Sequence, residues 1–171
     1  REKTAAHIAM QPFAQVPFIQ DGDTVLFESG AILLHLAEGT EMMPDDLRTQ
    51  VQQWLIAALN SVEVYSLAWF LSKFMDKDEA GATRREGLVR LRFQQLQSVL
   101  NGREWLTGDR FTVADLLMAE ILRLPGQYGL LDDVHELAAY AERATARPAF
   151  RKALADQMAH WQAADEKEAT A

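Results

Sequence analysis

The pattern of apolar and polar positions divides the chain into a short β-prone beginning and a long helical remainder. Residues 16–20 and 24–27 are two β-prone runs, and Asp21-Gly22-Asp23 separates them. An Asp-Gly pair between apolar runs is the strongest short-range signal for a hairpin, because glycine adopts a positive φ without steric cost. The beginning of the chain therefore predicts two antiparallel strands joined by a tight turn.

A helix start follows the second predicted strand directly. Glu28-Ser29 precedes the apolar run 30–34, and the predicted helix extends from Ser29 to about Glu38, where Gly39 ends it. Ile32, Leu33 and Leu36 are expected on one face. The first N–H groups of a helix have no partner within it and the helix dipole favours negative charge there, so this turn predicts a small anion-binding pocket.

From Leu47 onward the apolar positions recur every three or four residues, as in helices. The first of these helices is expected to run to Lys73, about seven turns. A second face is also mostly apolar, and it comprises Leu59, Glu63, Leu67, Phe70 and Phe74. A helix that is apolar on most faces is buried or contacts a partner. Further helices are expected over residues 83–100, from 112 to about 125, over 134–146 and from 148 onward.

A helix-start motif lies at residues 111–116. Thr112 is followed three residues later by Asp115, which resembles a capping box with Asp in place of the commoner Glu or Gln. We expect Thr112 and Asp115 to have a structural role, in folding and not in chemistry.

Composition excludes several classes of function. The 171 residues have a formal net charge of −8 and no cysteine, so the chain contains no disulfide, thiolate metal site or cysteine nucleophile. The acidic balance argues against nucleic acid or an anionic membrane as the main partner. The four histidines show no metal-ligand spacing, no apolar stretch is long enough for a membrane span, and a cytoplasmic protein is expected.

Two groups of residues resemble the glutathione S-transferase family. The first group is Val16-Pro17 with Glu28-Ser29-Gly30-Ala31-Ile32, and the second is the stretch 105–119 around Thr112 and Asp115. The resemblance implies a fold between α+β and all-α. It consists of a partial thioredoxin-like βα unit over residues 1–39, followed by the family's all-helical C-terminal domain over residues 40–171.

The resemblance also implies roles for single residues. Pro17 would be cis, the Val16 backbone would pair with the cysteinyl unit of glutathione, and Glu28 and Ser29 would hold its γ-glutamyl end. Each residue alone also allows another interpretation. Ser29 could be an ordinary N-cap, Glu28 a first-turn acid that suits the helix dipole, and Pro17 a strand-entry proline.

One position departs from the family's pattern. The family usually places a cationic or similar donor just before the Val-Pro pair, to bind the glycyl carboxylate of glutathione. Phe13 and Ala14 occupy those places here, which leaves Gln15, or else Lys3 or His7, as the donor.

Aromatic residues are the candidates for the pocket of an apolar electrophile. In the resembling fold the long helix borders that pocket, so Tyr65 and Trp69 would form its wall and Trp161 would close it. The alternative is that Tyr65 and Trp69 are ordinary core residues.

The implied function is that of a glutathione transferase, in which the thiolate of bound glutathione attacks an electrophilic or disulfide substrate. The catalytic residue is unknown. The first sixteen positions contain no Tyr, Ser or Cys, so we expect the catalytic hydroxyl or thiol upstream of Arg1. A homodimer is expected, through the long helix. A non-catalytic transferase-like module and a bare helical scaffold remain as alternatives.

Overall fold

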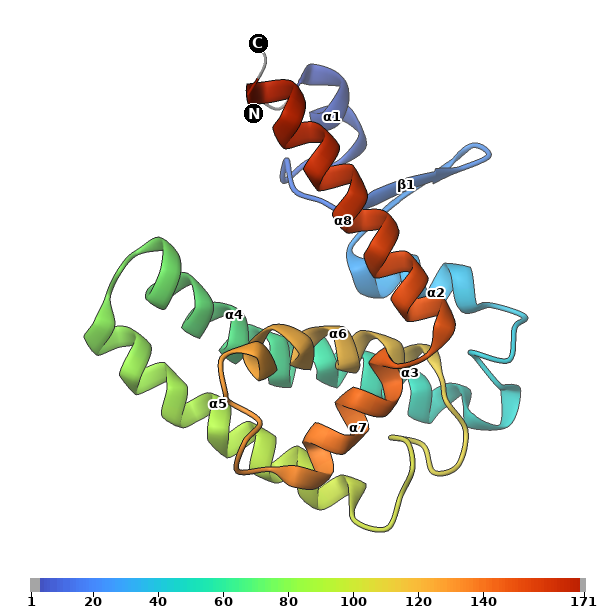
Figure 1. Ribbon diagram of the computed structural model, residues 1–171. Coiled ribbons are helices and arrows are strands. Elements are labelled where there is room, and N and C mark those ends of the chain that lie inside the picture. Colours follow the sequence, from blue (N-terminus) through green and yellow to red (C-terminus); the bar gives the residue numbers. More distant parts are fainter. Residues whose placement is uncertain (1–3, 170–171) are drawn as a thin grey trace.

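The computed structural model describes residues 4–169 as a small N-terminal unit seated on a bundle of helices (Figure 1). The N-terminal unit comprises α1 (Ala5–Met10), β1 (Phe18–Asp21), β2 (Thr24–Phe27) and α2 (Ser29–Ala37). The bundle comprises α3 (Arg48–Ala57), α4 (Val64–Phe70), α5 (Glu79–Leu100), α6 (Val113–Gln127), α7 (His135–Thr145) and α8 (Pro148–Ala169). This confirms the predicted fold class.

The predicted hairpin is present. Strands β1 and β2 pair antiparallel, with Phe18 opposite Phe27, and Gly22 in the turn has a φ of 58°. His35 on α2 donates from Nε2 to Asp21 Oδ2 at 2.8 Å, which links the tip of the hairpin to the helix that follows it. Leu36, expected on the inner face of α2, is instead 59% exposed, so the buried face of this helix is made by Gly30, Ile32 and Ala37.

The expected long helix is one continuous helical segment that contains two π-helical turns. A short 3₁₀ turn, η1 (Asp45–Leu47), leads into α3, and the π-helical segments η2 (Ala58–Glu63) and η3 (Leu71–Met75) lie before and after α4. A π-helical turn contains more residues than an α-helical turn, so it rotates every following side chain around the helix axis.

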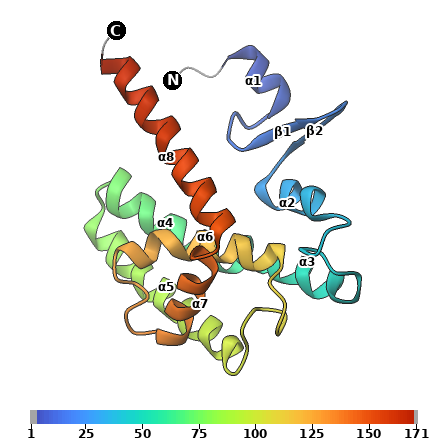
Figure 2. The same cartoon turned by 45° about the vertical axis from the view of Figure 1, so that its right-hand side comes forward.

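The core of the bundle lies between this long helix, α5, α6 and α7. Its fully buried members include Val51, Leu55, Trp69, Phe93 and Leu122. Against the expectation from the sequence, residues 45–75 are long and apolar enough in composition to span a membrane, and a third of their most apolar window is buried inside the protein. Figure 2 shows α8 projecting away from the bundle, past the N-terminal unit.

A buried carboxylate organises the start of α6. Asp115 is fully buried and forms the predicted capping box with Thr112, whose backbone N–H and hydroxyl both donate to Asp115 Oδ2 at 2.9 Å. The Leu106 N–H and the Tyr140 hydroxyl donate to Oδ1, at 2.9 and 3.0 Å. Burial raises the pKa of Asp115, and these four hydrogen bonds oppose that shift. The carboxylate joins the 105–110 loop, α6 and α7, as the structural role predicts.

We expect loss of this network to lower stability. Thr112→Ala should cost about 1 kcal/mol, or roughly 2–4 °C in Tm. Asp115→Ala should cost about 3 kcal/mol or more, because four buried donors lose their acceptor. Thermal unfolding measures both, with Thr49→Ala, at an exposed position on α3, as the control. Parental Tm values for the Thr112 and Asp115 variants would show that the network is not needed.

Candidate functional site

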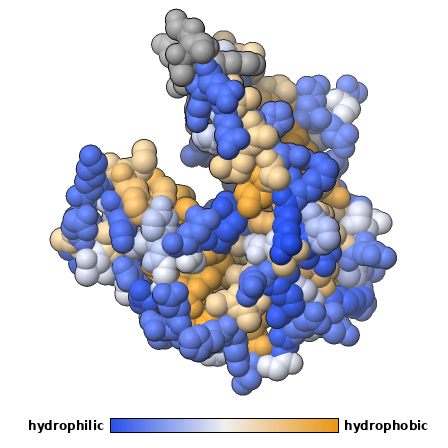
Figure 3. Space-filling view, viewed as in Figure 1, coloured by the Kyte–Doolittle hydropathy of each residue, from blue (hydrophilic) through white to orange (hydrophobic). Residues whose placement is uncertain are grey.

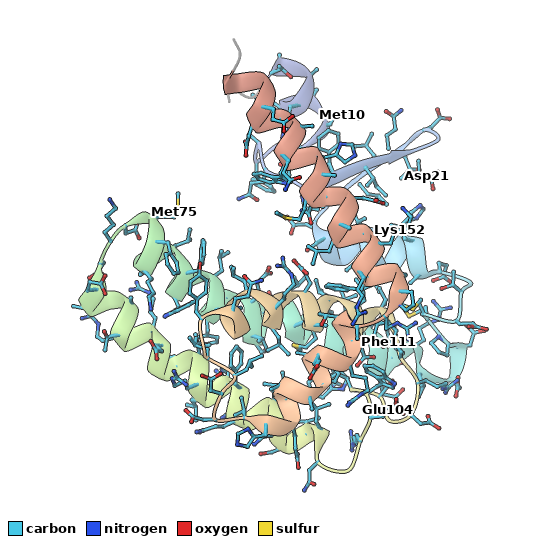
Figure 4. All side chains as sticks on the ribbon, in the orientation of Figure 1. Met10, Asp21, Met75, Glu104, Phe111 and Lys152 are labelled. Atoms are coloured by element: carbon cyan, nitrogen blue, oxygen red, sulfur yellow. The ribbon has the colours of Figure 1, made fainter. Side chains whose placement is uncertain are left out.

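A cavity of about 690 Å³ lies between the N-terminal unit and the bundle. Figure 3 shows the molecule hollowed on this side, and Figure 4 shows Met10 on one side of the hollow and Met75 at the end of the long helix on the other. The volume is in the range of small-molecule sites in proteins. The lining residues are Gln11, Gln15, Val16, Pro17, Glu28, Ser29, Glu63, Ser66, Leu67, Phe70, Leu117, Glu120, Ile121, Arg123, Leu124 and Pro125.

The loop before β1 presents Val16 to this cavity. The Val16–Pro17 peptide bond is cis, as the resemblance implies. Gln11, only 2% exposed, accepts a hydrogen bond from the Phe13 N–H at Oε1 (2.6 Å), and its carbonyl accepts from the Ala14 N–H at 3.0 Å. Gln11 thus holds the turn, which leaves Val16 76% exposed at the cavity.

The Glu28–Ser29 turn forms the other part of the N-terminal wall. Glu28 is the N-cap of α2 and has φ 70° and ψ 119°, a conformation that is strained for a residue with a Cβ. Its side chain makes no capping hydrogen bond. Among the side chains that the structure describes, those of residues 4–166, Glu28 and Ser29 have no partner, so both are available to a ligand beside the free N–H groups of α2.

The structure brings together all five residues that the resemblance assigns to glutathione, Gln15, Val16, Pro17, Glu28 and Ser29, at one cavity. It also excludes one alternative, that Ser29 is the N-cap of α2. Glu28 occupies the N-cap position, and Ser29 is the first helical residue. The binding role of the five stays a prediction. Of the other proposed donors, Lys3 lies outside the described residues, and His7 donates from Nε2 to the Gln15 carbonyl at 2.8 Å.

The aromatic residues predicted for the electrophile pocket lie elsewhere, which corrects that assignment. Trp69 is fully buried in the core, and its ring packs edge-on against Phe74 and Tyr128. The Tyr65 hydroxyl accepts a hydrogen bond from Arg92 of α5 at 2.9 Å. Trp161 is 64% exposed on α8 and does not line the cavity. The alternative interpretation, that both are core residues, is correct for Trp69, whereas Tyr65 is partly buried and packs against the core beside α5.

A neighbouring face of the same helix lines the cavity instead. Glu63, Ser66, Leu67 and Phe70 are spaced by three or four residues and so lie on one side of the helix. Glu63, Leu67 and Phe70 are the second face noted in the sequence, so the signal for them was present. Tyr65 and Trp69 were predicted because they are aromatic, but aromatic side chains at helical spacing are more often core residues.

The charged groups of the cavity differ in their partners. On α6, Arg123 makes two hydrogen bonds to the Glu120 carboxylate, from Nε at 2.8 Å and from Nη2 at 2.6 Å. The Glu63 carboxylate has no partner among the described side chains of residues 4–166, and burial raises the pKa of this carboxyl. The apolar part of the bundle wall consists of Leu67, Phe70, Leu117, Ile121 and Leu124.

The described residues offer no metal centre. No group of three or more His, Asp or Glu side chains in residues 4–169 is arranged to hold a metal ion. The arrangement suits an organic ligand with charged ends, because polar groups on the N-terminal wall face an apolar wall across the cavity.

Comparisons with known proteins agree with this geometry. Residues 1–38 match the glutathione S-transferase N-terminal domain model, and residues 39–148 match the C-terminal domain model. The chain is 30% identical to glutathione S-transferase F11 of Arabidopsis thaliana, over 90% of this chain and 79% of that protein. It is 30% identical to glutathione S-transferase 3 of Zea mays, over 89% and 78%.

A solved structure is similar in three dimensions. It is that of a glutathione transferase family member from Pseudomonas fluorescens Pf-5 with two glutathione molecules bound. It superposes with a TM-score of 0.78 at 26% identity, over 87% of this chain and 74% of that one.

Gln11, which the sequence did not single out, should prove essential for the Val16 loop. We expect Gln11→Ala to lower stability by about 1–3 kcal/mol, because the packing of the buried Gln11 side chain and its part-buried hydrogen bond from the Phe13 N–H are both lost. Gln15→Ala, at an exposed side chain of the same loop, is the matched control and should unfold as the parent does. Equal denaturant midpoints for parent and Gln11→Ala would contradict this role.

Proposed function

The chain belongs to the glutathione S-transferase family and is a glutathione transferase that uses glutathione as co-substrate; on that premise we propose how its cavity holds the two substrates. Glutathione lies along the N-terminal wall, with its γ-glutamyl end at Glu28 and Ser29 and its cysteinyl unit at Val16. The second substrate lies against the bundle wall. The observation that supports this best is the convergence of both walls on one cavity.

The Glu28–Ser29 turn has the groups that a γ-glutamyl end requires. The ammonium of that group needs an anionic acceptor, which the unpartnered carboxylate of Glu28 supplies. Its α-carboxylate needs donors, and the Ser29 hydroxyl and the first N–H groups of α2 supply them at the positive end of the helix dipole. With the strained backbone conformation at Glu28, both Glu28 and Ser29 line the cavity before any ligand binds.

Val16 and Gln15 suit the rest of the tripeptide. The Val16 backbone is exposed at the cavity, where it can pair with the extended cysteinyl unit as a neighbouring strand would. Gln15 lines the same wall, and its amide can donate to the glycyl carboxylate in place of the family's cation. An amide is a weaker partner for a carboxylate than a cation is, so we expect the glycyl end to contribute less affinity than the γ-glutamyl end.

The second substrate is a small electrophile bound against Leu67, Phe70, Leu117, Ile121 and Leu124. These side chains come from two helices that face Val16 across the cavity, so an apolar group held there lies next to the cysteinyl unit. Holding both reactants in one site makes the attack of the thiolate effectively unimolecular.

Removal of the Glu28 carboxylate tests the glutathione site. A charge-assisted hydrogen bond contributes about 1.5–3 kcal/mol, so Glu28→Gln should weaken glutathione binding by roughly tenfold or more. Asp23→Asn, on the exposed hairpin turn, removes the same charge without touching the cavity and should bind as the parent does. Isothermal titration with glutathione measures all three proteins. Parental affinity in Glu28→Gln would disprove the site.

We also propose that the protein is a homodimer. Ile56, Val64, Leu71 and Met75 form an apolar stripe along the long helix and are 41–68% exposed, and Leu88 and Leu91 on the adjacent α5 are exposed as well. A solvated stripe of this kind is typical of a surface that another chain covers, and a two-fold pair is the commonest assembly.

Charges placed in this stripe should separate the two copies. We expect sedimentation of the parent as a dimer at micromolar concentration, and of Ile56→Glu/Val64→Glu as a folded monomer, because each buried unpaired charge is costly at an interface. Met158→Glu, at an exposed apolar position on α8, should remain a dimer. A monomeric parent would rule out this assembly.

A further inference from the structure

One carboxylate in the cavity has no counter-charge. Glu63 lies at the end of the π-helical segment η2, on the bundle wall, and its side chain is half-buried. Among residues 4–166, whose side chains the structure describes, the Glu63 carboxylate makes no hydrogen bond or ion pair. A half-buried carboxylate has lost part of its hydration, and a protein usually compensates such a loss with a partner.

The other charged groups that face the cavity do not supply that partner. Arg123 is held by two hydrogen bonds to Glu120, so its guanidinium is already neutralised. Glu28 lies on the opposite wall and is assigned to the ammonium of glutathione. Glu63 is therefore the one lining carboxylate that remains unmatched among the described residues once glutathione is in place.

The surroundings of Glu63 define what could approach it. The Ser66 hydroxyl donates to the Glu63 backbone carbonyl at 3.1 Å, so it is occupied within the helix and does not compensate the carboxylate. Leu67 and Phe70 lie one and two turns further along the same face and offer an apolar surface beside it. An aromatic or apolar body with a donor at one end fits this combination.

We propose that Glu63 determines specificity for the second substrate, by selecting apolar electrophiles that bear a cationic or hydrogen-bond-donating group and rejecting anionic ones. The proposal rests on the proposed function, because it places the second substrate on the bundle wall. It follows from the unmatched carboxylate beside Leu67 and Phe70. The raised pKa of Glu63 agrees with it, since burial disfavours the anion until a positive group approaches.

S-substituted glutathiones test the proposal, because their common glutathione half reports on the glutathione site and their substituent reports on the bundle wall. The probes are S-(4-aminomethylbenzyl)-, S-(4-methylbenzyl)- and S-(4-carboxybenzyl)glutathione, with unsubstituted glutathione as reference, and isothermal titration gives their Kd values. In the parent we expect the ammonium probe to bind about tenfold more tightly than the carboxylate probe, as for one charge-assisted hydrogen bond.

Two variants separate a local effect of Glu63 from the acidic charge of the whole protein. Glu63→Gln keeps the size of the side chain and should reduce the preference to within about twofold. Glu136→Gln changes the net charge equally at an exposed position on α7 that does not line the cavity, and it should keep the full preference. Both variants should bind unsubstituted glutathione as the parent does.

Equal affinity of the parent for the ammonium and carboxylate probes would overturn the proposal without any substitution being needed. A preference that persists in Glu63→Gln would overturn it as well. Failure of the parent to bind glutathione itself would overturn the proposed function, and this inference with it. Binding of glutathione without discrimination between the probes would leave the glutathione site standing and remove only the role of Glu63.

Discussion

The close packing of the start of α2 against the long helix is the constraint on which the site depends. A Cβ at Gly30 would lie 2.8 Å from Leu59 Cδ1 and 3.1 Å from Leu55 Cδ2, so a larger residue there would require these two leucine side chains to shift. The segment after α2 is also attached to the bundle. Met43 is 2% exposed, and the Val113 N–H at the start of α6 donates to the Met42 carbonyl at 3.0 Å. A two-stranded hairpin is only marginally stable alone in water, and packing of the N-terminal unit against the bundle stabilises it.

The same packing positions the ligand-binding groups of the protein before a ligand binds. Glu28 and Ser29 precede Gly30 directly, so the seating of α2 on the long helix fixes where the helix start points. On the other side of the cavity, the network around Asp115 fixes the start of α6, whose later turns supply Leu117, Glu120 and Ile121. Binding groups that are already in place lose less conformational entropy when a substrate arrives.

Much of this arrangement could be predicted from the sequence, because local signals determine it. The Asp-Gly turn, the Glu-Ser helix start and the Thr112–Asp115 capping box each depend on residues within a few positions of one another, and each formed as predicted. The glutathione wall lies within one short stretch, so its five residues were found together.

The bundle wall could not be predicted in the same way, because it depends on contacts between distant segments. Glu63, Leu67 and Phe70 formed one face of the long helix in the sequence, but that this face lines the cavity, while Tyr65 packs on α5 and Trp69 lies in the core, depends on how the helices assemble. The contribution of α6 required knowing which helix lies beside α4. Gln11 was missed because a buried glutamine that closes a turn has no pattern of its own in the sequence.

The central claim is that glutathione binds at the junction of the Val16 loop and the start of α2. Titration of ¹⁵N-labelled protein with glutathione, followed by amide chemical shifts, tests it most directly. The account predicts that the largest shifts occur at the amides of Val16, Ser29 and Gly30, whereas the amides of His135 and Glu142, which line a separate surface groove beside α7, do not move. Saturable shifts centred on α7, with Val16 and Ser29 unchanged, would contradict the account.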